Sequence, residues 1–497
     1  MGQEIEQLEH IDLQGRLVLC EELRHFEDVE LFARKYEESL ARTVRRNEGI
    51  FYTPQDIVET IFGDAIDGSV DLSDKRFCDP CCGSGNFLIR ALEVGFRPEN
   101  IFGFDTDKQG VEIARARFIE AVEQLEQSDK AGFDIEKQIK VADFFKIASL
   151  KRYSGYFDYI MTNPPWGSKL TKKRRLDFSI QFESGRSNDS SAIMTCAALN
   201  TLSEGGVLAL LLPDSFFNIG GFEDVRRRLL ALHTTHLRDF GKPFPKLMTR
   251  AQSIIVRNVA LAEEDVEASQ IRCFYDGAEH KRSVGSFCRN PKAIINMWLN
   301  AAGAQVVDAI FAKEHITLHG SAKWALGIVT GNNDRYCSDV KKRGYVGVLR
   351  GKNLLPNNVI TEASSFINSN LKRYQQVAPR EIYDAPSKIL YRFISSDLVF
   401  CHDDAGRYML NSVNVLIPDD DFPIAHRDVA AMLSSPLMNW LFRAVWRTHK
   451  ILRNDIERLP LHVGYFAESG NSEFDFKSYC KYLGIKMSRA GKFSLIK

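Results

Sequence analysis

Apolar and polar positions follow two different periods between residues 50 and 260. Short apolar runs of the length of buried strands alternate with longer segments in which apolar residues recur about every three or four positions, as on one face of a helix. Strands separated by helices of roughly ten to fifteen residues predict βαβ units and a mostly parallel, doubly wound α/β sheet. We expect strands at 76–78, 101–104, 139–142, 157–162, 206–212 and 252–259, and helices at 54–66, 86–94, 108–126 and about 190–203.

The pattern changes on both sides of this region. Residues 18–46 are highly charged and lack Gly and Pro, which predicts one or two helices. Beyond an acidic stretch at 261–269 the regularity is lost, and short strands, turns and helices near 426–447 are typical of a separate α+β domain. We therefore expect three parts: an N-terminal helical segment at 1–48, an α/β domain at 49–262 and a second domain at 263–497.

The composition is that of a folded protein, with 44% hydrophobic and 26% charged residues. Because no apolar run reaches about eighteen residues and no signal peptide begins the chain, we expect no membrane segment and a cytoplasmic location. The ten Cys are expected to be free thiols. Residues 1–150 carry 18 Lys+Arg against 31 Asp+Glu, so in a chain of zero net charge the remainder is basic. That remainder can approach phosphates, although solvated faces on separate domains would give the same balance.

A glycine-rich turn separates the first expected strand from its helix. Asp79 and Pro80 precede Gly83 and Gly85. Glycines let a ligand approach the backbone, and the start of the helix offers free N–H groups. Asp105 lies 20 residues beyond Gly85, at a strand end where a carboxylate can accept hydrogen bonds from both ribose hydroxyls of a nucleoside. Together they indicate an adenosine-containing cofactor, either a dinucleotide or S-adenosylmethionine.

A third strand runs into Asp143 and Phe144, which could contact the amine and the face of a purine. This pair alone is weak evidence, since both residue types are common in such places. The cysteines around the glycine turn have no second Cys or His pair nearby to complete a zinc site. His315 and His319 have the spacing of metal ligands but lack a neighbouring Glu, so we predict no metal site.

The strand expected at 157–162 is followed directly by Asn163, Pro164, Pro165 and Trp166. A nucleobase amine is a poor nucleophile because its lone pair is delocalised into the ring. If the Asn163 side-chain oxygen and the Pro164 carbonyl each accept one of its N–H groups, the lone pair shifts toward a methyl donor. The proline rings fix the backbone before the reaction, and Trp166 offers a flat face for the base. The alternative is a Pro-Pro turn followed by a core Trp.

These motifs, in this order, resemble the gamma class of N6-adenine-specific DNA methyltransferases of the restriction-modification type. The match runs from about 49 to 258 and includes GIFYTPQDIV and KPFPKLMTRAQSIIVRN. The resemblance implies a Rossmann-like, S-adenosylmethionine-dependent methyltransferase domain at 49–262 and a target-recognition, DNA-binding domain at 263–497. Such an enzyme methylates N6 of a flipped-out adenine in a specific duplex DNA sequence. Restriction activity, if present, is expected in a separately encoded restriction endonuclease.

The resemblance assigns roles residue by residue. Thr53 and Pro54 open a helix near the methionine carboxylate, and local physics favours Thr53 as its N-cap. Asp79 and the glycine loop hold the methionine part, Asp105 the ribose, and Asp143 with Phe144 the cofactor adenine. The cofactor set is Tyr52, Thr53, Pro54, Asp79, Pro80, Gly83, Gly85, Asp105, Asp143 and Phe144. The catalytic set is Asn163, Pro164, Pro165, Trp166 and Phe244, in which Phe244 stacks on the target base opposite Trp166.

Basic residues after the Asn-Pro-Pro-Trp element are candidates for phosphate contacts, with a solvated loop as the alternative. They are Lys169, Lys172, Lys173, Arg174 and Arg175. In the second domain the candidates for base or phosphate contacts are Arg335, Arg350, Lys352, Lys372 and Arg373. The triple Arg at 226–228 is expected to form a solvated helix face.

Three other functions compete with this one. Asn-Pro-Pro followed by an aromatic residue also occurs in similar enzymes that methylate RNA bases or protein glutamine, and N4-cytosine transfer is a milder variant. A non-catalytic DNA-binding module with a relic cofactor fold is disfavoured by the complete set of motifs. A fused nuclease is not expected, because the 48 residues ahead of the Tyr-Thr-Pro element are too few for one.

Overall fold

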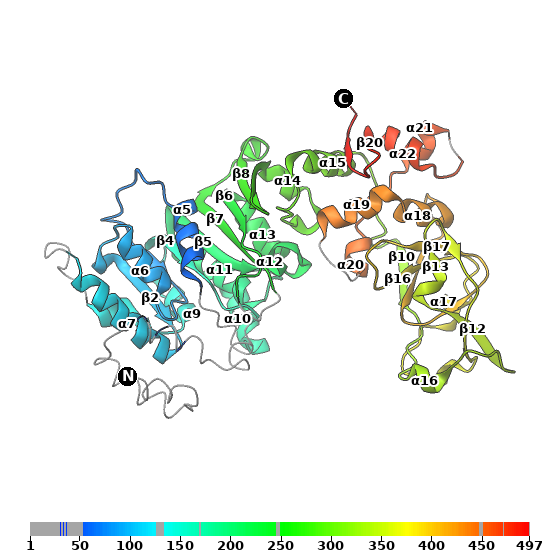
Figure 1. Cartoon of the computed structure of the whole chain (residues 1–497), viewed down its shortest axis with the longest axis horizontal. Coiled ribbons are helices and arrows are strands. Elements are labelled where there is room, and N and C mark those ends of the chain that lie inside the picture. Colours follow the sequence, from blue (N-terminus) through cyan, green and yellow to red (C-terminus); the bar gives the residue numbers. More distant parts are fainter. Residues whose placement is uncertain are drawn as a thin grey trace. The chain divides into compact units, whose positions relative to one another are not determined.

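The computed structural model describes residues 53–125, 134–167, 170–244, 249–446, 451–470 and 472–496, together with Glu30, Ala33 and Tyr36. The chain divides into two compact units (Figure 1). The first comprises Met1–Cys288 with Lys292–Trp298, and the second Arg289–Pro291 with Leu299–Lys497. Apart from Glu30, Ala33 and Tyr36, which are helical, the predicted segment at 1–48 lies outside the described residues.

The first unit is built on one mixed sheet. Its strands are β1 (Phe77–Asp79), β2 (Ile101–Asp105), β3 (Ile139–Val141), β4 (Phe157–Thr162), β5 (Leu202–Pro213), β6 (Leu232–Asp239), β7 (Ala251–Ala260), β8 (Gln270–Tyr275) and β9 (Ala278–Ser283). They are ordered β3-β2-β1-β4-β5-β7-β6-β8-β9. The pairs from β3 to β5 are parallel, and β7 is antiparallel to both β5 and β6. The predicted doubly wound α/β fold is confirmed.

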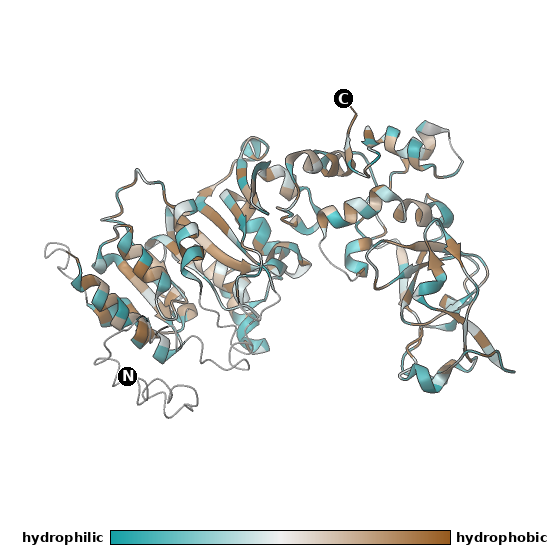
Figure 2. Ribbon diagram, viewed as in Figure 1, coloured by the Kyte–Doolittle hydropathy of each residue, from teal (hydrophilic) through white to brown (hydrophobic). Residues whose placement is uncertain are grey.

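Helices cover both faces of this sheet. They are α5 (Gln55–Ala65), α6 (Asn86–Glu93), α7 (Lys108–Glu123), α8 (Ile135–Gln138), α9 (Phe144–Ala148), α10 (Lys172–Gln181), α11 (Ser190–Thr201), α12 (Asp214–Asn218), α13 (Glu223–Leu230) and α14 (Val284–Cys288). Two hydrophobic cores result, one with residues of α5, α6 and α7, the other with residues of α9, α11 and α13. Alternate residues of β5 enter different cores, as Leu208 and Ala209 do, because side chains of a strand point to opposite faces. Figure 2 shows how strongly hydrophobic residues concentrate on these strands.

The first unit extends further along the chain than the predicted boundary at 262/263. β8 pairs with β6 in parallel and with β9 in an antiparallel hairpin. The acidic stretch that suggested a boundary contains a short 3-10 turn, η7 (Glu263–Asp265), between β7 and β8. The pattern also missed β6, whose polar sequence LHTTHLRD buries only a few side chains. The polar hairpin β8–β9, which forms one edge of the sheet, was therefore taken for the start of a new domain.

The second unit contains two four-stranded sheets, with its longer helices before and after them in sequence. One sheet has the order β10-β19-β16-β17 and the other β11-β15-β12-β18. The strands are β10 (Ala322–Leu326), β11 (Cys337–Ser338), β12 (Tyr345–Leu349), β13 (Leu354–Leu355), β14 (Val359–Ile360), β15 (Ser365–Asn368), β16 (Lys388–Arg392), β17 (Phe400–Asp403), β18 (Tyr408–Met409), β19 (Val413–Pro418), β20 (Ile485–Met487) and β21 (Phe493–Leu495). The helices are α15 (Ala301–Ala312), α16 (Asn333–Tyr336), α17 (Arg380–Tyr383), α18 (His426–Leu433), α19 (Pro436–Val445), α20 (Arg453–Ile456), α21 (Gly464–Ser469) and α22 (Phe476–Tyr482). This is the predicted α+β character.

None of the helices in the described ranges is both long and apolar enough to cross a lipid bilayer.

Candidate active site

Four polar side chains stand at one edge of the sheet of the first unit. Asp79 and Asp105 are the last residues of β1 and β2, while Asp143 and Asn163 follow β3 and β4. Because these strands are parallel neighbours in the order β3-β2-β1-β4, their carboxyl ends meet at the same edge. The order of strands reverses between β1 and β4, and ligands of doubly wound sheets bind at such a switch point.

The glycine loop between β1 and α6 is tied to the end of β2. The Gly83 amide donates to Oδ2 of Asp105 at 2.9 Å, and the Asp107 amide donates to Oδ1 at 2.9 Å. Gly85 has a φ of +94°, and a Cβ atom there would lie 3.1 Å from the Cβ of Ala114 on α7. Glycine is therefore required at 85 both for the left-handed turn and for the close approach of two helices.

Two carboxylates of this edge lie in surroundings that disfavour a bare negative charge. Asp79 is 1% exposed, and its Oδ1 accepts the Cys81 amide at 3.0 Å. Burial raises its pKa from 3.8 to about 7, against the opposing effect of a hydrogen bond from Thr162. Burial also raises the pKa of Asp105, although the amides of Asp107 and Gly83 oppose the shift. A cation or several hydrogen-bond donors from a ligand would stabilise both carboxylates.

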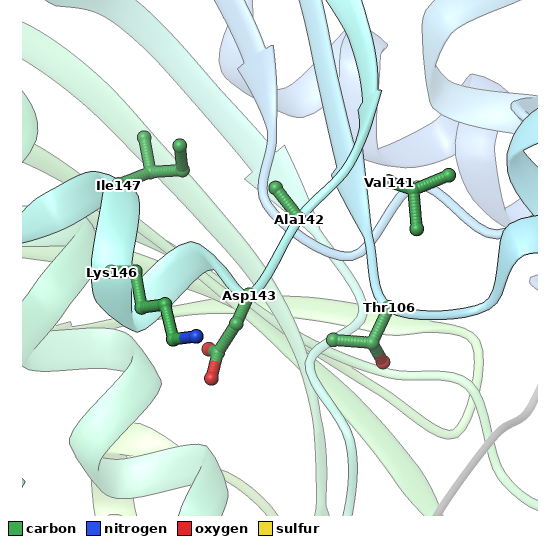
Figure 3. Close-up of a pocket in the computed structure, with 6 residues that line it drawn as sticks. All are labelled: Thr106, Val141, Ala142, Asp143, Lys146 and Ile147. Carbon is green, nitrogen blue, oxygen red and sulfur yellow. The ribbon is translucent and has the colours of Figure 1, made fainter.

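The Asp143 carboxylate lies beside a cavity at the end of β3. Thr106, Val141, Ala142, Asp143, Lys146 and Ile147 line it (Figure 3). Oδ1 of Asp143 accepts the Phe145 amide at 3.1 Å and thereby caps α9. Oδ2 forms an ion pair with Nη2 of Arg174 on α10, at 2.6 Å. The carboxylate therefore has a partner at each oxygen.

The position of Phe144 corrects the interpretation of that residue. Its ring is 2% exposed and packs against Phe104 with the ring centroids 5.7 Å apart. As the first residue of α9, Phe144 turns into the hydrophobic core. Val141 and Ile147 instead contribute apolar side chains to the cavity lining. Which side chains face the cavity depends on the direction in which α9 leaves the sheet.

A chain of hydrogen bonds ends at the Asn163 side chain. Nδ2 of Asn163 donates to Oγ1 of Thr53 at 3.2 Å. The Thr53 carbonyl accepts from Nδ2 of Asn86 at 2.9 Å, and Oδ1 of Asn86 accepts from Arg117 at 2.7 Å. Arg117 also donates to the Ser84 carbonyl of the glycine loop at 2.7 Å. These contacts connect the Asn163 amide, whose nitrogen lies toward Thr53, to the loop.

This chain of hydrogen bonds corrects the predicted helix start and adds two residues to the site. The N-cap of α5 is Pro54 without a side-chain hydrogen bond, and the Thr53 hydroxyl accepts from Asn163. Asn86 and Arg117 were missed. Asn86 directly follows the glycine loop, which is a usable signal, whereas Arg117 lies within an ordinary helical pattern. Arg117 is 6% exposed and also forms an ion pair with Glu30 at 2.6 Å.

The Pro-Pro-Trp segment is anchored at three points. The Pro165 carbonyl accepts from Oγ of Ser190 at 3.1 Å, and Nε1 of Trp166 donates to the Leu211 carbonyl at 3.3 Å. The Trp166 and Phe244 rings touch edge to face, with centroids 5.3 Å apart and planes at 81°. The structure thus brings together the two aromatic residues that the resemblance paired. A base stacked between both would require parallel, more separated rings.

Four of the five basic residues after this segment lie on α10. Thr171 caps the helix by accepting the Arg174 amide at 3.3 Å. Lys172, Lys173 and Arg174 are exposed in its first turn, and Arg175 is half-buried. Lys169 and Tyr52 lie outside the described residues.

The candidates in the second unit sit on short helical turns. Arg335 belongs to α16 and is exposed, with its guanidinium 5.4 Å from the Tyr336 ring. Arg350 and Lys352 lie at η9 (Gly351–Asn353), where Lys352 is exposed and Arg350 half-buried.

The triple Arg at 226–228 is not a solvated face. Arg226 is fully buried, and its guanidinium donates to four backbone carbonyls. Burial lowers its pKa to about 9. Arg228 donates to the Phe182 carbonyl at 2.7 Å and to the side chain of Asn200 at 2.9 Å. Two of the three arginines therefore hold segments of the first unit together.

Every cysteine except Cys20 lies in the described residues, and each of those described is a free thiol. Within the ranges that the structure describes, no group of three or more His, Cys, Asp or Glu side chains is arranged to hold a metal ion.

The sheet order and the acids at its strand ends define a Rossmann-like methyltransferase fold, and comparisons with known proteins agree. Residues 27–238 match the family N-6 DNA Methylase, and residues 346–461 match the TaqI-like C-terminal specificity domain. The chain is 40% identical over 319 residues to the Type II methyltransferase M.VspI of Vibrio sp. (strain 343), covering 64% of this chain and 74% of that protein. It is 24% identical over 224 residues to the modification methylase CviBIII of Paramecium bursaria Chlorella virus NC1A, covering 45% of this chain and 53% of that protein.

Solved structures show the same fold at low sequence identity. The Type IIL restriction-modification enzyme MmeI in complex with DNA has a TM-score of 0.51 at 13% identity, covering 88% of this chain and 70% of that one. The DrdV-DNA complex has a TM-score of 0.52 at 11% identity, covering 89% of this chain and 58% of that one.

The chain belongs to the N-6 DNA methylases, the adenine-specific DNA methyltransferases of restriction-modification systems. The resemblance seen in its motifs is thereby confirmed, as is the presence of a C-terminal specificity domain.

Proposed function

We propose that the protein transfers the methyl group of S-adenosylmethionine to N6 of an adenine flipped out of a specific duplex DNA sequence, as the modification enzyme of a restriction-modification system. The observation that carries this proposal is the order of acceptors along the sheet edge. Asp143, Asp105, Asp79 and Asn163 follow β3, β2, β1 and β4, which are neighbours in that order. The cofactor presents its adenine amine, ribose hydroxyls and methionine ammonium in the same order, followed by the target amine.

The chemistry of this set of acceptors suits S-adenosylmethionine. Asp79 is a buried carboxylate with a raised pKa, which an ammonium group would stabilise. Asp105 is fixed by two backbone amides and retains lone pairs for the ribose hydroxyls. Asp143 lies at a cavity lined by Val141 and Ile147, which suits a purine. The bound cofactor supplies an electrophilic methyl group.

The residues of the Asn-Pro-Pro-Trp segment act on the target base. The Asn163 amide nitrogen is turned to Thr53, so its oxygen is the end that can accept an N–H of the target amine. The Pro164 carbonyl accepts the other N–H, and the two acceptors draw the amine lone pair out of conjugation. No residue needs to act as a base before transfer, because the methylated amine is strongly acidic. Trp166, anchored at Leu211, offers its face for stacking.

DNA is engaged by both units in this proposal. A base within a duplex cannot reach the sheet edge, so it is flipped at a cost on the order of a few kcal/mol. Lys172, Lys173 and Arg175 on α10 contact phosphates near the flipped base. The second unit reads the sequence, and Arg335, Arg350 and Lys352 in it contact base edges or phosphates. A separate restriction endonuclease cleaves the same site, and the enzyme works in the cytoplasm.

A methyl-transfer assay tests this function directly. The purified protein is incubated with radiolabelled S-adenosylmethionine and, in parallel, with duplex DNA, RNA or protein acceptors. We expect label in duplex DNA only, and sequencing of host DNA with and without the gene should map N6-methyladenine to one short sequence. Incorporation only into RNA or protein would contradict the proposal, and N4-methylcytosine would contradict its target base.

A further inference from the structure

One ion pair connects the cofactor cavity with the basic helix. Nη2 of Arg174, in the first turn of α10, lies 2.6 Å from Oδ2 of Asp143, at the end of β3. The Arg174 guanidinium also lies 5.2 Å from the ring of Phe178 on the same helix. Asp143 is 19% exposed and Arg174 47% exposed. The contact joins two elements that the proposed function assigns to different ligands, the cofactor and DNA.

Arg174 and a bound adenine would compete for the same carboxylate. Oδ1 of Asp143 already caps α9, which leaves Oδ2 as the oxygen that can turn to a ligand in the cavity. Oδ2 is the atom that Arg174 contacts. A purine amine that approaches this oxygen from the cavity competes with the guanidinium for its lone pairs.

We propose that Arg174 is a switch that couples the two ligands: cofactor binding at Asp143 releases its guanidinium, which then contacts a DNA phosphate. The inference rests on the proposed function. Breaking the ion pair between Arg174 and Asp143 costs little free energy, because a partly exposed ion pair is weak. It therefore lowers the affinity for the cofactor by only a small factor. The freed arginine lies in one helical turn with Lys172 and Lys173, where the N-terminal end of the helix also favours an anion.

The two bindings are then linked. Without cofactor, Arg174 is held at Asp143 and one phosphate contact is missing. With cofactor, that contact is added, so the cofactor strengthens DNA binding. By thermodynamic linkage, DNA strengthens cofactor binding by the same factor. The enzyme thereby favours DNA engagement when a methyl donor is present.

The test compares Arg174→Gln with Lys173→Gln, which removes the same charge from the same helical turn. Within the described part of the chain, Lys173 forms no ion pair with Asp143. Two quantities are measured for the wild type and each variant: the Kd for S-adenosylhomocysteine without DNA, and the Kd for a labelled duplex carrying the mapped site, with and without S-adenosylhomocysteine over a series of salt concentrations. Melting temperatures check that both variants are folded.

For the wild type, saturating S-adenosylhomocysteine should steepen the slope of log K against log salt by about 0.9, the value for one phosphate contact. In Arg174→Gln the slope should be the same with and without cofactor, and S-adenosylhomocysteine alone should bind about two- to fivefold more tightly than to the wild type. Lys173→Gln should lose DNA affinity but keep the wild-type cofactor affinity and the cofactor-dependent change in slope.

The switch is overturned if Arg174→Gln and Lys173→Gln behave alike in cofactor affinity and in slope. It is also overturned if the wild type binds S-adenosylhomocysteine but the Kd for DNA and its salt slope are the same with and without it. A wild type that binds no S-adenosylhomocysteine at all would instead remove the proposed function, and the switch with it.

Discussion

The sheet edge of the first unit and the basic residues of the second unit hold their functional groups in different ways. Asp79 is almost fully buried, and Asp105 is fixed by two backbone amides. Arg335 and Lys352 are exposed side chains on short turns. A methyl transfer always involves the same atoms, so its hydrogen-bond acceptors must be held in place before the reaction. Contacts to phosphates and bases on a DNA surface instead need long side chains that extend into solvent. Motifs are therefore informative for the first region and weak for the second.

The sharpest test of fixed acceptors is Asn163→Ala. The target amine would lose one of its two acceptors, so we expect the rate of methyl transfer to fall by about 10²- to 10³-fold or more. Cofactor affinity and melting temperature should stay close to the wild type, because the hydrogen bond to Thr53 that is lost contributes only about 1 kcal/mol. Single-turnover transfer of radiolabelled methyl groups measures the rate. Undiminished methylation of DNA would show that Asn163 does not hold the amine.

The burial of Asp79 predicts a pH dependence that exposed residues do not share. Its pKa of about 7 means that the free site is protonated below pH 7, whereas the cofactor ammonium favours the carboxylate. Affinity for S-adenosylhomocysteine should therefore rise as pH increases to about 7, by up to about tenfold per pH unit, and level off above it. Calorimetry between pH 5.5 and 8.5 measures this. Asp79→Asn should bind weakly with a much flatter profile, and some dependence should remain because the pKa of Asp105 is raised too.

The contact between Thr53 and Asn163 can be removed at nearly constant volume. Thr53→Val loses the acceptor that turns the Asn163 nitrogen away from the target, so we expect kcat to fall by about three- to tenfold, the value of one hydrogen bond. Thr53→Ser keeps the hydroxyl and should restore most of the rate. The affinity for S-adenosylhomocysteine is measured alongside. If Thr53→Val lowered that affinity and left kcat unchanged, Thr53 would serve the cofactor and not Asn163.

The smallest effect is expected in the second unit. Lys352→Gln removes one exposed charge, so DNA affinity should fall by a few-fold and the salt slope by about 0.9. The methylated sequence should not change, since a phosphate contact carries no sequence information. Sequencing of the methylated DNA and binding at several salt concentrations check both statements. An altered recognition sequence would place Lys352 at a base edge and would weaken the contrast between the two regions.

Local patterns predicted the elements near the site well. The strand expected at 157–162 is β4 with the same bounds, and the predicted strands and helices around the glycine loop appear within a few residues. Each of these elements depends on residues close in sequence: an apolar run, a glycine turn, or a Pro-Pro that ends a strand. The domain boundary was wrong because β8 joins the sheet by pairing with β6, and pairing between distant segments leaves no local signal.

Individual side chains were harder to place. Arg226 and Arg228 look like any charged helix residues, yet they donate to carbonyls of distant segments. Phe144 was expected at the cofactor and lies in the core, because the direction in which α9 leaves β3 decides which side chain faces the cavity. Thr53 has the usual sequence position of an N-cap, but the distant Asn163 takes its hydroxyl.

The sequence by itself determined the doubly wound sheet, the strand ends that carry polar residues, and the family to which the chain belongs. Those features follow from periodicity and from short motifs in which the chemistry needs particular residues side by side. Only the tertiary structure decided how the groups are connected: Arg117 through Asn86 to Thr53, Trp166 against Phe244, and Arg174 on Asp143. These contacts join residues far apart in the chain, and whether they form depends on the packing of whole elements, which no local pattern encodes.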